Sequence, residues 1–171
     1  MDQAPAHIIA PEAPAHAAAL ERVLDRAFGP GRFAKTSERV REQGARHRLD
    51  LSRVALRGDA PVGLCRMHDI SVGGAPALFL GPLAVDPAHQ QAGLGAALVE
   101  AALTAARIQP ARAVLAVGAA NFFAPFGFVP IPEGRVTMPG PVDPRRLLWL
   151  PLKHDAAEKL AGAVGPPMDR A

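Results

Sequence analysis

One stretch decides the fold, and it reads Leu80-Gly-Pro-Leu-Ala-Val-Asp-Pro-Ala-His-Gln-Gln-Ala-Gly-Leu-Gly95. Its apolar first part predicts a buried strand, which Asp86 and Pro87 end. A loop punctuated by glycine follows and opens into an alanine-rich helix. The free backbone N–H groups of such a loop, together with about half a positive charge at the helix start, attract phosphate. The stretch therefore predicts a strand, an anion-binding loop and a helix, and with them a phosphate-bearing cofactor.

The size and composition of the chain favour an ordinary globular protein. Its 171 residues fit a single domain, with a core over about 7–152 and a C-terminal tail over about 153–171. Hydrophobic residues make up 49% and charged residues 20%, which excludes a disordered polymer and a membrane protein. Residues 1–5 lack the basic start and apolar core of a signal peptide, so we expect a cytoplasmic protein.

Cysteine and charge exclude further classes. The lone Cys65 excludes a disulfide framework and a cysteine-rich zinc site, and its apolar surroundings predict a packed thiol. The net charge is +3, but the basic residues are scattered along the chain. Their densest cluster favours a solvated helix face over a nucleic-acid surface, and it comprises Arg39, Arg41, Arg46 and Arg48.

The N-terminal third predicts a short strand and two helices. Residues 7–10 form the strand, and Pro14 then opens an amphipathic helix that ends at residues 29–31. Thr36 or Ser37 is expected to cap a second helix, which runs to about Gly44.

The middle of the chain predicts a mixed sheet. Strands over 51–56, 61–72 and 77–85 form an antiparallel meander, and a helix over 94–108 leads to a parallel strand over 113–117. Gly81-Pro82 interrupts the third strand and predicts a bulge or splay. After a short helix or turn over 121–126 and a return to the sheet at 127–129, we expect a strand over 147–152 and a terminal helix over 155–164. The expected fold class is α/β with a mixed sheet.

Two common phosphate motifs do not fit the glycine loop. A dinucleotide fingerprint would need glycine where Leu98 stands, and a P-loop would need Lys-Ser/Thr after its second glycine. The loop instead resembles the coenzyme A signature Gln/Arg-x-x-Gly-x-Gly/Ala of the GCN5-related N-acetyltransferases (GNAT), as Gln90-Gln91-Ala92-Gly93-Leu94-Gly95. The resemblance continues into the segment Asn121 to Phe128, and the wording of 80–87 resembles a subgroup of small bacterial predicted acetyltransferases.

The resemblance implies the GNAT acyl-CoA N-acyltransferase fold, acetyl-CoA as the acyl donor and no metal. The splayed strand would pair with the pantetheine arm, the loop N–H groups would bind the pyrophosphate, and Asn121 would lie near the thiol end. A backbone N–H near Val85 would stabilise the oxyanion. The implied cofactor contacts are Leu83, Ala84, Val85, Gln90, Gln91, Ala92, Gly93, Leu94, Gly95, Ala96 and Asn121.

The chain departs from the family at one position. The family commonly uses a tyrosine to protonate the leaving thiolate, and here that position is Phe123; the chain contains no tyrosine. Losing a general acid typically costs about 10²- to 10⁴-fold in rate. Three consequences stay open: transfer driven by positioning alone, another acid among His68, Asp69, Ser71 and Asn121, or a protein that binds acyl-CoA with little transferase activity.

The resemblance thus predicts an N-acetyltransferase that moves an acetyl group to a primary amine, on a small molecule or a protein, by direct attack in a ternary complex. The alternative is a weak or inactive acyl-CoA-binding or sensing protein. No nucleic-acid or membrane partner is expected, and family members often form homodimers. Residues 29–46 and 130–146 would set the acceptor. Phe126 and Phe128 are expected in the core, and Phe122 or Phe123 beside the acyl or acceptor pocket.

Overall fold

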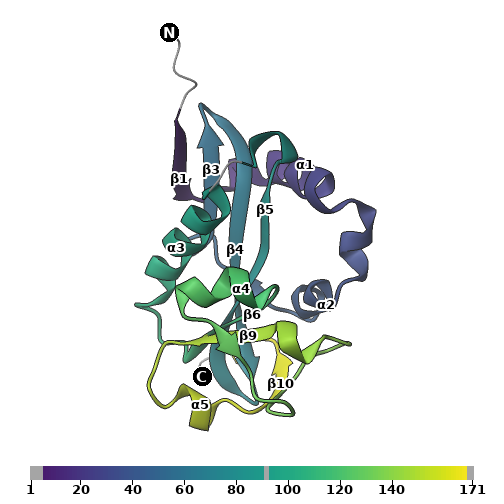
Figure 1. Cartoon of the computed structure of the whole chain (residues 1–171), viewed down its shortest axis with the longest axis vertical. Coiled ribbons are helices and arrows are strands. Elements are labelled where there is room, and N and C mark those ends of the chain that lie inside the picture. Colours follow the sequence, from purple (N-terminus) through teal and green to yellow (C-terminus); the bar gives the residue numbers. More distant parts are fainter. Residues whose placement is uncertain (1–5, 91–92, 169–171) are drawn as a thin grey trace.

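The computed structural model describes residues 6–90 and 93–168 and centres on a mixed sheet (Figure 1). Its longest strands, β4 (Ala60–Val72) and β5 (Ala75–Val85), pair antiparallel. The strand order is β1-β3-β4-β5-β6-β9-β7. Only β5 and β6 run parallel along this path, within the described chain. The other strands on the path are β1 (His7–Pro11), β3 (Arg53–Arg57), β6 (Ala113–Val117), β7 (Val129–Pro130) and β9 (Leu147–Pro151). The fold is therefore the expected mixed α/β arrangement.

Short elements extend the sheet at its edges. Strand β2 (Arg46–His47) pairs with β4, and β10 (Gly162–Gly165) pairs with both β4 and β8 (Val136–Thr137). Single turns of 3-10 helix connect the larger elements, at Pro14–His16, Pro30–Ala34, Pro87–His89, Ala124–Phe126 and Pro144–Arg146.

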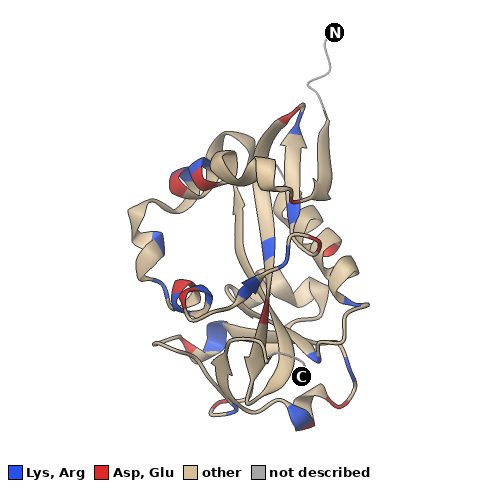
Figure 2. Ribbon diagram, turned by 180° about the vertical axis from the view of Figure 1, so that it is seen from behind, with Lys and Arg blue, Asp and Glu red and all other residues tan. Residues whose placement is uncertain are grey.

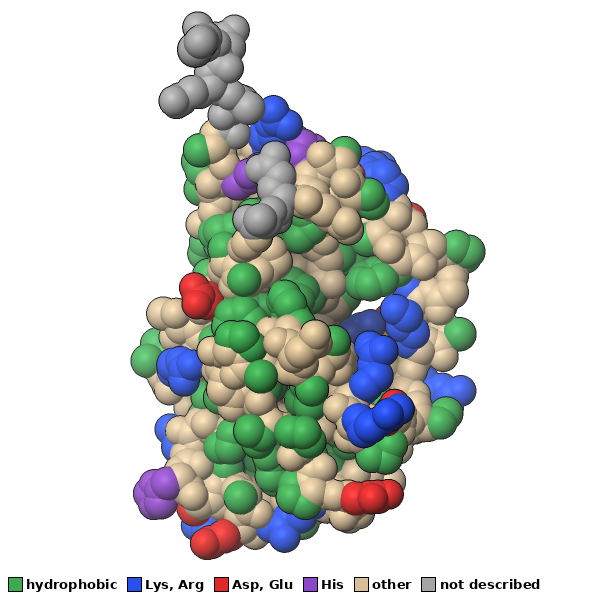
Figure 3. Space-filling model, viewed as in Figure 1, with side chains coloured by type: hydrophobic (Ala, Val, Ile, Leu, Met, Phe, Trp, Pro, Cys, Tyr) green, Lys and Arg blue, Asp and Glu red, His purple; other side chains and the backbone are tan. Residues whose placement is uncertain are grey.

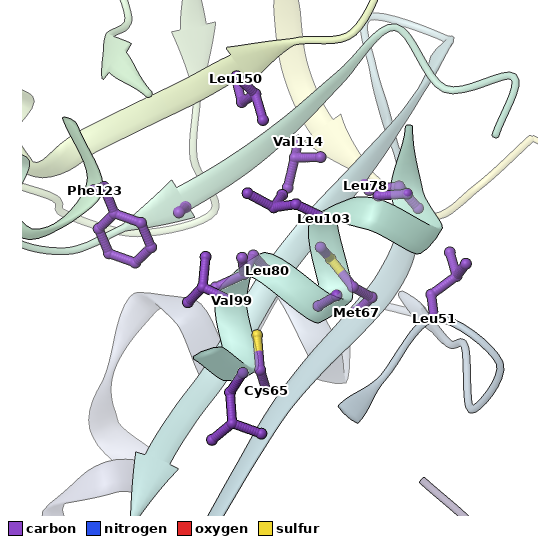
Figure 4. Close-up of a cluster of buried hydrophobic side chains, with 14 of the residues drawn as sticks. Leu51, Cys65, Met67, Leu78, Leu80, Val99, Leu103, Val114, Phe123 and Leu150 are labelled. Atoms are coloured by element: carbon purple, nitrogen blue, oxygen red, sulfur yellow. The ribbon is translucent and has the colours of Figure 1, made fainter. Parts of the chain in front are cut away.

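Helices cover both faces of the sheet because side chains of β4 alternate between them. Helix α1 (Ala17–Phe28) packs Leu20 and Leu24 against Leu64 on one face. Helix α3 (Leu94–Ala106) packs against Cys65 and Met67 on the other face (Figure 4). Cys65 is fully buried, and this burial raises the pKa of its thiol to about 12, so it is a packed core residue as expected.

The expected terminal helix over 155–164 is wrong beyond its first turn. Helix α5 spans only Ala156–Lys159, and the chain then forms β10. Val164 is buried and pairs with Val72, and Gly162 has φ +115°, which helix geometry does not allow. Pairing with the end of β4 therefore outweighs the local helix propensity.

The second helix is present but does not have the expected cap. Helix α2 spans Thr36–Glu42, and its N-cap is Lys35, with no side-chain hydrogen bond. The Thr36 hydroxyl instead donates to the Pro141 carbonyl (2.5 Å), which ties α2 to the loop before β9.

The basic cluster also differs from the expected solvated helix face. Only Arg39 and Arg41 lie on α2, while Arg46 and Arg48 form ion pairs with Asp69 (3.4 and 3.1 Å). Charges of both signs alternate along α1 and α2 (Figure 2). None of the helices in the described ranges combines the length and the apolar character that crossing a membrane requires.

Candidate functional site

Strand β5 loses one of its two neighbours halfway along its length. It pairs with β6 only through Leu78–Leu80, whereas its pairing with β4 continues to Val85. One edge of β5 is therefore free of a strand partner from Gly81 to Val85, within the part of the chain described. We call this open edge the fork; it is the splay that Gly81-Pro82 predicted.

A bulge marks the start of the fork. Leu80 is opposite Met67 and Leu83 is opposite Cys65, so that Gly81 and Pro82 together face a single residue of β4. Gly81 has φ +140°, which glycine adopts without the steric cost that other residues meet. The Gly81–Pro82 peptide bond is cis. The expected bulge is confirmed.

The hydrogen-bond pattern shows which backbone groups face the fork. The Asp86 N–H donates to the Val62 carbonyl (2.8 Å), next to the Gly63 and Val85 pair. Bonded and non-bonded pairs alternate in antiparallel strands. Ala84 consequently bonds back to β4, while Leu83 and Val85 direct their N–H and C=O groups toward the fork. Of the three expected backbone contacts, Leu83 and the Val85 N–H remain available to a ligand, whereas Ala84 bonds within the sheet and the Val85 carbonyl accepts the Gln90 side chain.

The loop after β5 is held by a buried carboxylate. The side chain of Asp86 accepts the Ala88 N–H (3.0 Å) and the Arg26 guanidinium Nε–H (2.8 Å). These contacts, the Ala88 N–H first, lower the pKa of Asp86, so it stays ionised. The Gln90 side chain lies exposed at the end of this loop and donates to the Val85 carbonyl (3.5 Å). Gln91 and Ala92 lie outside the described residues.

Helix α3 begins at a glycine in the left-handed region. Gly93 has φ +92° and is the N-cap of the helix. The Ala97 N–H donates to the Gly93 carbonyl (2.9 Å), so the N–H groups of Leu94, Gly95 and Ala96 precede the first bond of the helix. A Cβ at Gly93 would meet no atom of the described residues within 4 Å, so these residues leave the space beside this first turn open.

A cavity of about 590 Å³ adjoins the start of the fork. Leu80–Leu83 of β5, Val117 at the end of β6, and Phe123 line it, together with residues of α1, residues 32–41 and residues 141–146. Lys and Arg side chains gather on one side of a hollow on this face of the molecule (Figure 3). The residues that line the cavity are Leu24, Phe28, Arg32, Ala34, Lys35, Thr36, Ser37, Glu38, Arg41, Leu80, Gly81, Pro82, Leu83, Val117, Phe123, Pro141, Val142, Asp143 and Arg146.

Phe123 sits at the edge of this cavity in helix α4 (Ala120–Phe123). Its ring makes edge contacts with Phe122 (5.0 Å between centroids) and Phe128 (5.2 Å), and it borders the core around α3 (Figure 4). Phe128 is buried and Phe126 packs against the same core, as expected, whereas Phe122 is 38% exposed. Phe123 is therefore the phenylalanine that combines core packing with a place on the cavity wall.

The structure separates the candidate acids from the cavity, because none of the four is among its lining residues. His68 is buried, and burial lowers its pKa to about 3, so the imidazole is neutral near pH 7. The Ser71 hydroxyl donates to the Pro166 carbonyl (2.7 Å), and Asp69 forms ion pairs with Arg46 and Arg48. Asn121 is exposed within α4.

The cavity also contains charged residues to which the sequence assigned no role. Arg41 donates from Nε and Nη2 to Glu38 (3.2 and 2.7 Å), and its Nη1 is buried without a partner in the described structure. A Cβ at Gly81 would lie 3.8 Å from this Nη1. Lys35 and Arg146 line the walls above it. In the sequence, only the basic character of residues 29–46 and 130–146 pointed to these side chains. The two segments come together only in the tertiary fold.

Comparisons with known proteins agree with this geometry. A profile described as "Acetyltransferase (GNAT) family" matches residues 17–128. Among curated proteins, no sequence matches the chain.

Solved structures share the fold over most of the chain. A GNAT family N-acetyltransferase (YhbS) from Escherichia coli, in complex with CoA, is 25% identical with a TM-score of 0.78, over 97% of this chain and 92% of that one. A GNAT family acetyltransferase from Brucella melitensis, in complex with acetyl-CoA, is 25% identical with a TM-score of 0.60, over 88% and 97%. The E. coli ribosomal-protein-S18-alanine N-acetyltransferase shares the fold at 18% identity, with a TM-score of 0.59 over 86% and 95%.

Proposed function

Because the chain belongs to the Acetyltransferase (GNAT) family, we propose that it transfers an acetyl group from acetyl-CoA to a primary amine by direct attack in a ternary complex. The acceptor is a small-molecule amine or a protein amino group. One observation carries this proposal: the fork and the cavity meet at Gly81–Leu83, so a ligand along the open edge of β5 and a second ligand in the cavity would touch there.

The cofactor would bind mainly through backbone groups. Pyrophosphate oxygens would accept N–H groups from Gly93, Leu94, Gly95 and Ala96, where the helix dipole adds favourable charge. The pantetheine arm would pair with Leu83 and Val85, whose polar groups face the fork. The complexes of YhbS with CoA and of the Brucella protein with acetyl-CoA support this assignment.

The reaction forms an N–C bond to the thioester carbonyl and breaks the C–S bond. The carbonyl oxygen becomes an oxyanion, which a correctly placed backbone N–H stabilises. Leu83 fits this role better than Val85, because Leu83 lines the cavity and Val85 does not. The sulfur leaves as a thiolate, since Phe123 has no proton to give, and the proton that the attacking amine loses goes to water. The rate acceleration therefore comes from the positioning of the amine against the thioester and from oxyanion binding.

Release of free CoA thiol tests the proposal. Purified protein is mixed with acetyl-CoA and a panel of primary amines, and thiol is measured against reactions without amine or without protein. We expect thiol release above both blanks, with mass spectrometry identifying the N-acetylated amine. Thermal stabilisation by CoA is measured in parallel, and the absence of any stabilisation would contradict cofactor binding.

The position of Phe123 favours a second candidate function, an acyl-CoA-binding or sensing protein. The ring lines the cavity wall where a proton donor would be useful, and the four candidate acids are not in that wall. This alternative predicts stabilisation by acetyl-CoA and no thiol release with any amine.

A further inference from the structure

We propose that the cavity binds an acceptor amine that also carries a carboxylate, and that Lys35 and Arg146 bind this carboxylate. The inference rests on the proposed acetyl transfer, because it assigns the cavity to the acceptor. It goes beyond that proposal in naming the acceptor's chemistry and the side chains that recognise it.

The charges in the cavity wall do not cancel. Each acidic lining residue already has a basic partner: Glu38 binds Arg41 (2.7 Å), and Asp143 binds Arg145 outside the cavity (2.8 Å). Arg32 is in turn neutralised by Glu21 and Asp25 (2.8 and 3.1 Å).

The other two basic residues that line the cavity are Lys35 and Arg146. Neither Lys35 nor Arg146 forms an ion pair within the described ranges, and both are exposed at the mouth of the cavity. Arg146 lies near Asp143 and helps to lower the pKa of its carboxyl, but Asp143 is ion-paired with Arg145. The Lys35 ammonium lies 4.3 Å from the centre of the Phe28 ring, which holds it at the wall without neutralising its charge. Because these cations come from two segments that meet at the cavity, residues 32–41 and 141–146, an anion between them would contact both segments.

Arg41, whose charge Glu38 balances, adds a hydrogen-bond donor deeper in the same cavity. Its Nη1 is buried without a hydrogen-bond partner in the part of the chain described, next to Gly81 at the start of the fork. At this place the unpaired donor favours the neutral amine, which attacks the thioester, over its ammonium form. Together with the charges of Lys35 and Arg146, this favours anionic acceptors over polyamines and other dications.

The size and apolar surface of the cavity favour a small amine. A volume of about 590 Å³ is within the usual range for small-molecule sites. Leu24, Phe28 and Val142 supply apolar surface to the same cavity. A compound with an amine, an apolar middle and a carboxylate would match these three kinds of group.

Matched pairs of ligands test the inference by calorimetry on the CoA-loaded protein. Dipeptides are compared with their own C-terminal carboxamides, in which the changed carboxylate is remote from the amine. We expect at least one carboxylate to bind about tenfold tighter than its amide. The advantage should shrink to about twofold in Arg146→Gln and in Lys35→Gln. Arg107→Gln removes an exposed charge at the end of α3, outside the cavity, and should preserve it.

Thiol release with the same pairs separates this inference from the proposed function. Carboxylate-selective binding without thiol release would contradict acetyl transfer and leave the acceptor chemistry supported. Thiol release with equal or tighter binding of the amides would overturn the inference and leave acetyl transfer supported. If none of the carboxylates binds, or if Arg107→Gln reduces the preference as much as Arg146→Gln, the inference is wrong.

Discussion

The two sides of the candidate site are built from different parts of the polypeptide. On the cofactor side, the fork and the start of α3 offer backbone N–H and C=O groups, arranged by Gly81, Pro82 and Gly93. On the acceptor side, the cavity offers charged side chains from two segments far apart in the chain. A site made of backbone leaves glycine and proline at fixed spacing in the sequence, whereas a site made of side chains leaves no such spacing. Substitutions on each side should therefore fail in different ways.

The largest effect is expected from Gly93→Val, on the cofactor side. Valine at φ +92° is strained, and its branched side chain would enter the open space beside the first turn of α3. We expect the affinity for CoA, measured by calorimetry, to fall about a hundredfold, equivalent to about 2.7 kcal/mol.

Gly134→Val is the matched control for this substitution. Gly134 also has a positive φ (+79°) with open space around it, but it lies in the turn before β8, away from the fork. Both variants should lose similar stability in urea, while only Gly93→Val should lose CoA affinity. Equal CoA affinities in the two variants would mean that the glycine loop does not bind CoA.

Phe123→Tyr is expected to have the next largest effect, at the junction of the two sides. The substitution adds one hydroxyl to a ring that lines the cavity, and general acids contribute about 10²- to 10⁴-fold in rate. We expect the rate of thiol release to rise at least about tenfold, less than the full range because the ring is packed between Phe122 and Phe128.

Phe126→Tyr provides the comparison for this gain. Phe126 is in the same segment but does not line the cavity. A similar rate increase in both variants would show that the hydroxyl at position 123 is not acting as the acid.

The same contrast explains what the sequence could predict. The strand over 113–117 and the start of α3 at Leu94 agree with the sequence expectation, because local apolar patterns determine them. The terminal helix was wrong because Val164 gains a sheet partner in Val72 that is remote in sequence. For Lys35 and Arg146 the sequence indicated only that their segments set the acceptor, because the meeting of the two segments is a property of the fold, not of either segment.

A third prediction concerns the buried His68 and the charged residues around it. His68 stacks on His47 (5.1 Å between centroids), which binds Glu12 (3.1 Å), and Arg66 also binds Glu12 (2.9 Å). Burial, with His47, Arg41 and Arg66 nearby, lowers the pKa of His68 from 6.5 to about 3. Below pH 6.5 the unfolded chain therefore binds a proton that the folded protein does not, so stability falls as the pH is lowered toward 3.

Urea unfolding between pH 6.5 and 4.5 measures this dependence. The contribution of His68 is about 1.4 kcal/mol per pH unit, and His68→Gln should flatten the profile by that amount. Glu12, whose pKa is lowered from 4.5 by His47 and Arg66 against the effect of its burial, adds the same dependence to both proteins near the lower end of this interval, so the difference between the two profiles reports on His68. His154→Gln, at an exposed position, should leave the profile unchanged. An unchanged profile in His68→Gln would mean that His68 is not held neutral in the folded protein.

The smallest effect is expected from Arg145→Gln, which alters the acceptor side without touching the cavity wall. Arg145 is 89% exposed in its side chain and neutralises Asp143, which does line the cavity. Removing Arg145 leaves the Asp143 carboxylate free near Arg146, where it would compete with a bound carboxylate. Since exposed ion pairs are weak, we expect carboxylated acceptors to bind about threefold more weakly, with no change for their amides. The double variant Arg145→Gln/Asp143→Asn should restore the affinity, because it removes the competing charge together with its partner. Failure to restore it would mean that Arg145 acts through the conformation of residues 141–146 rather than through the charge balance of the cavity.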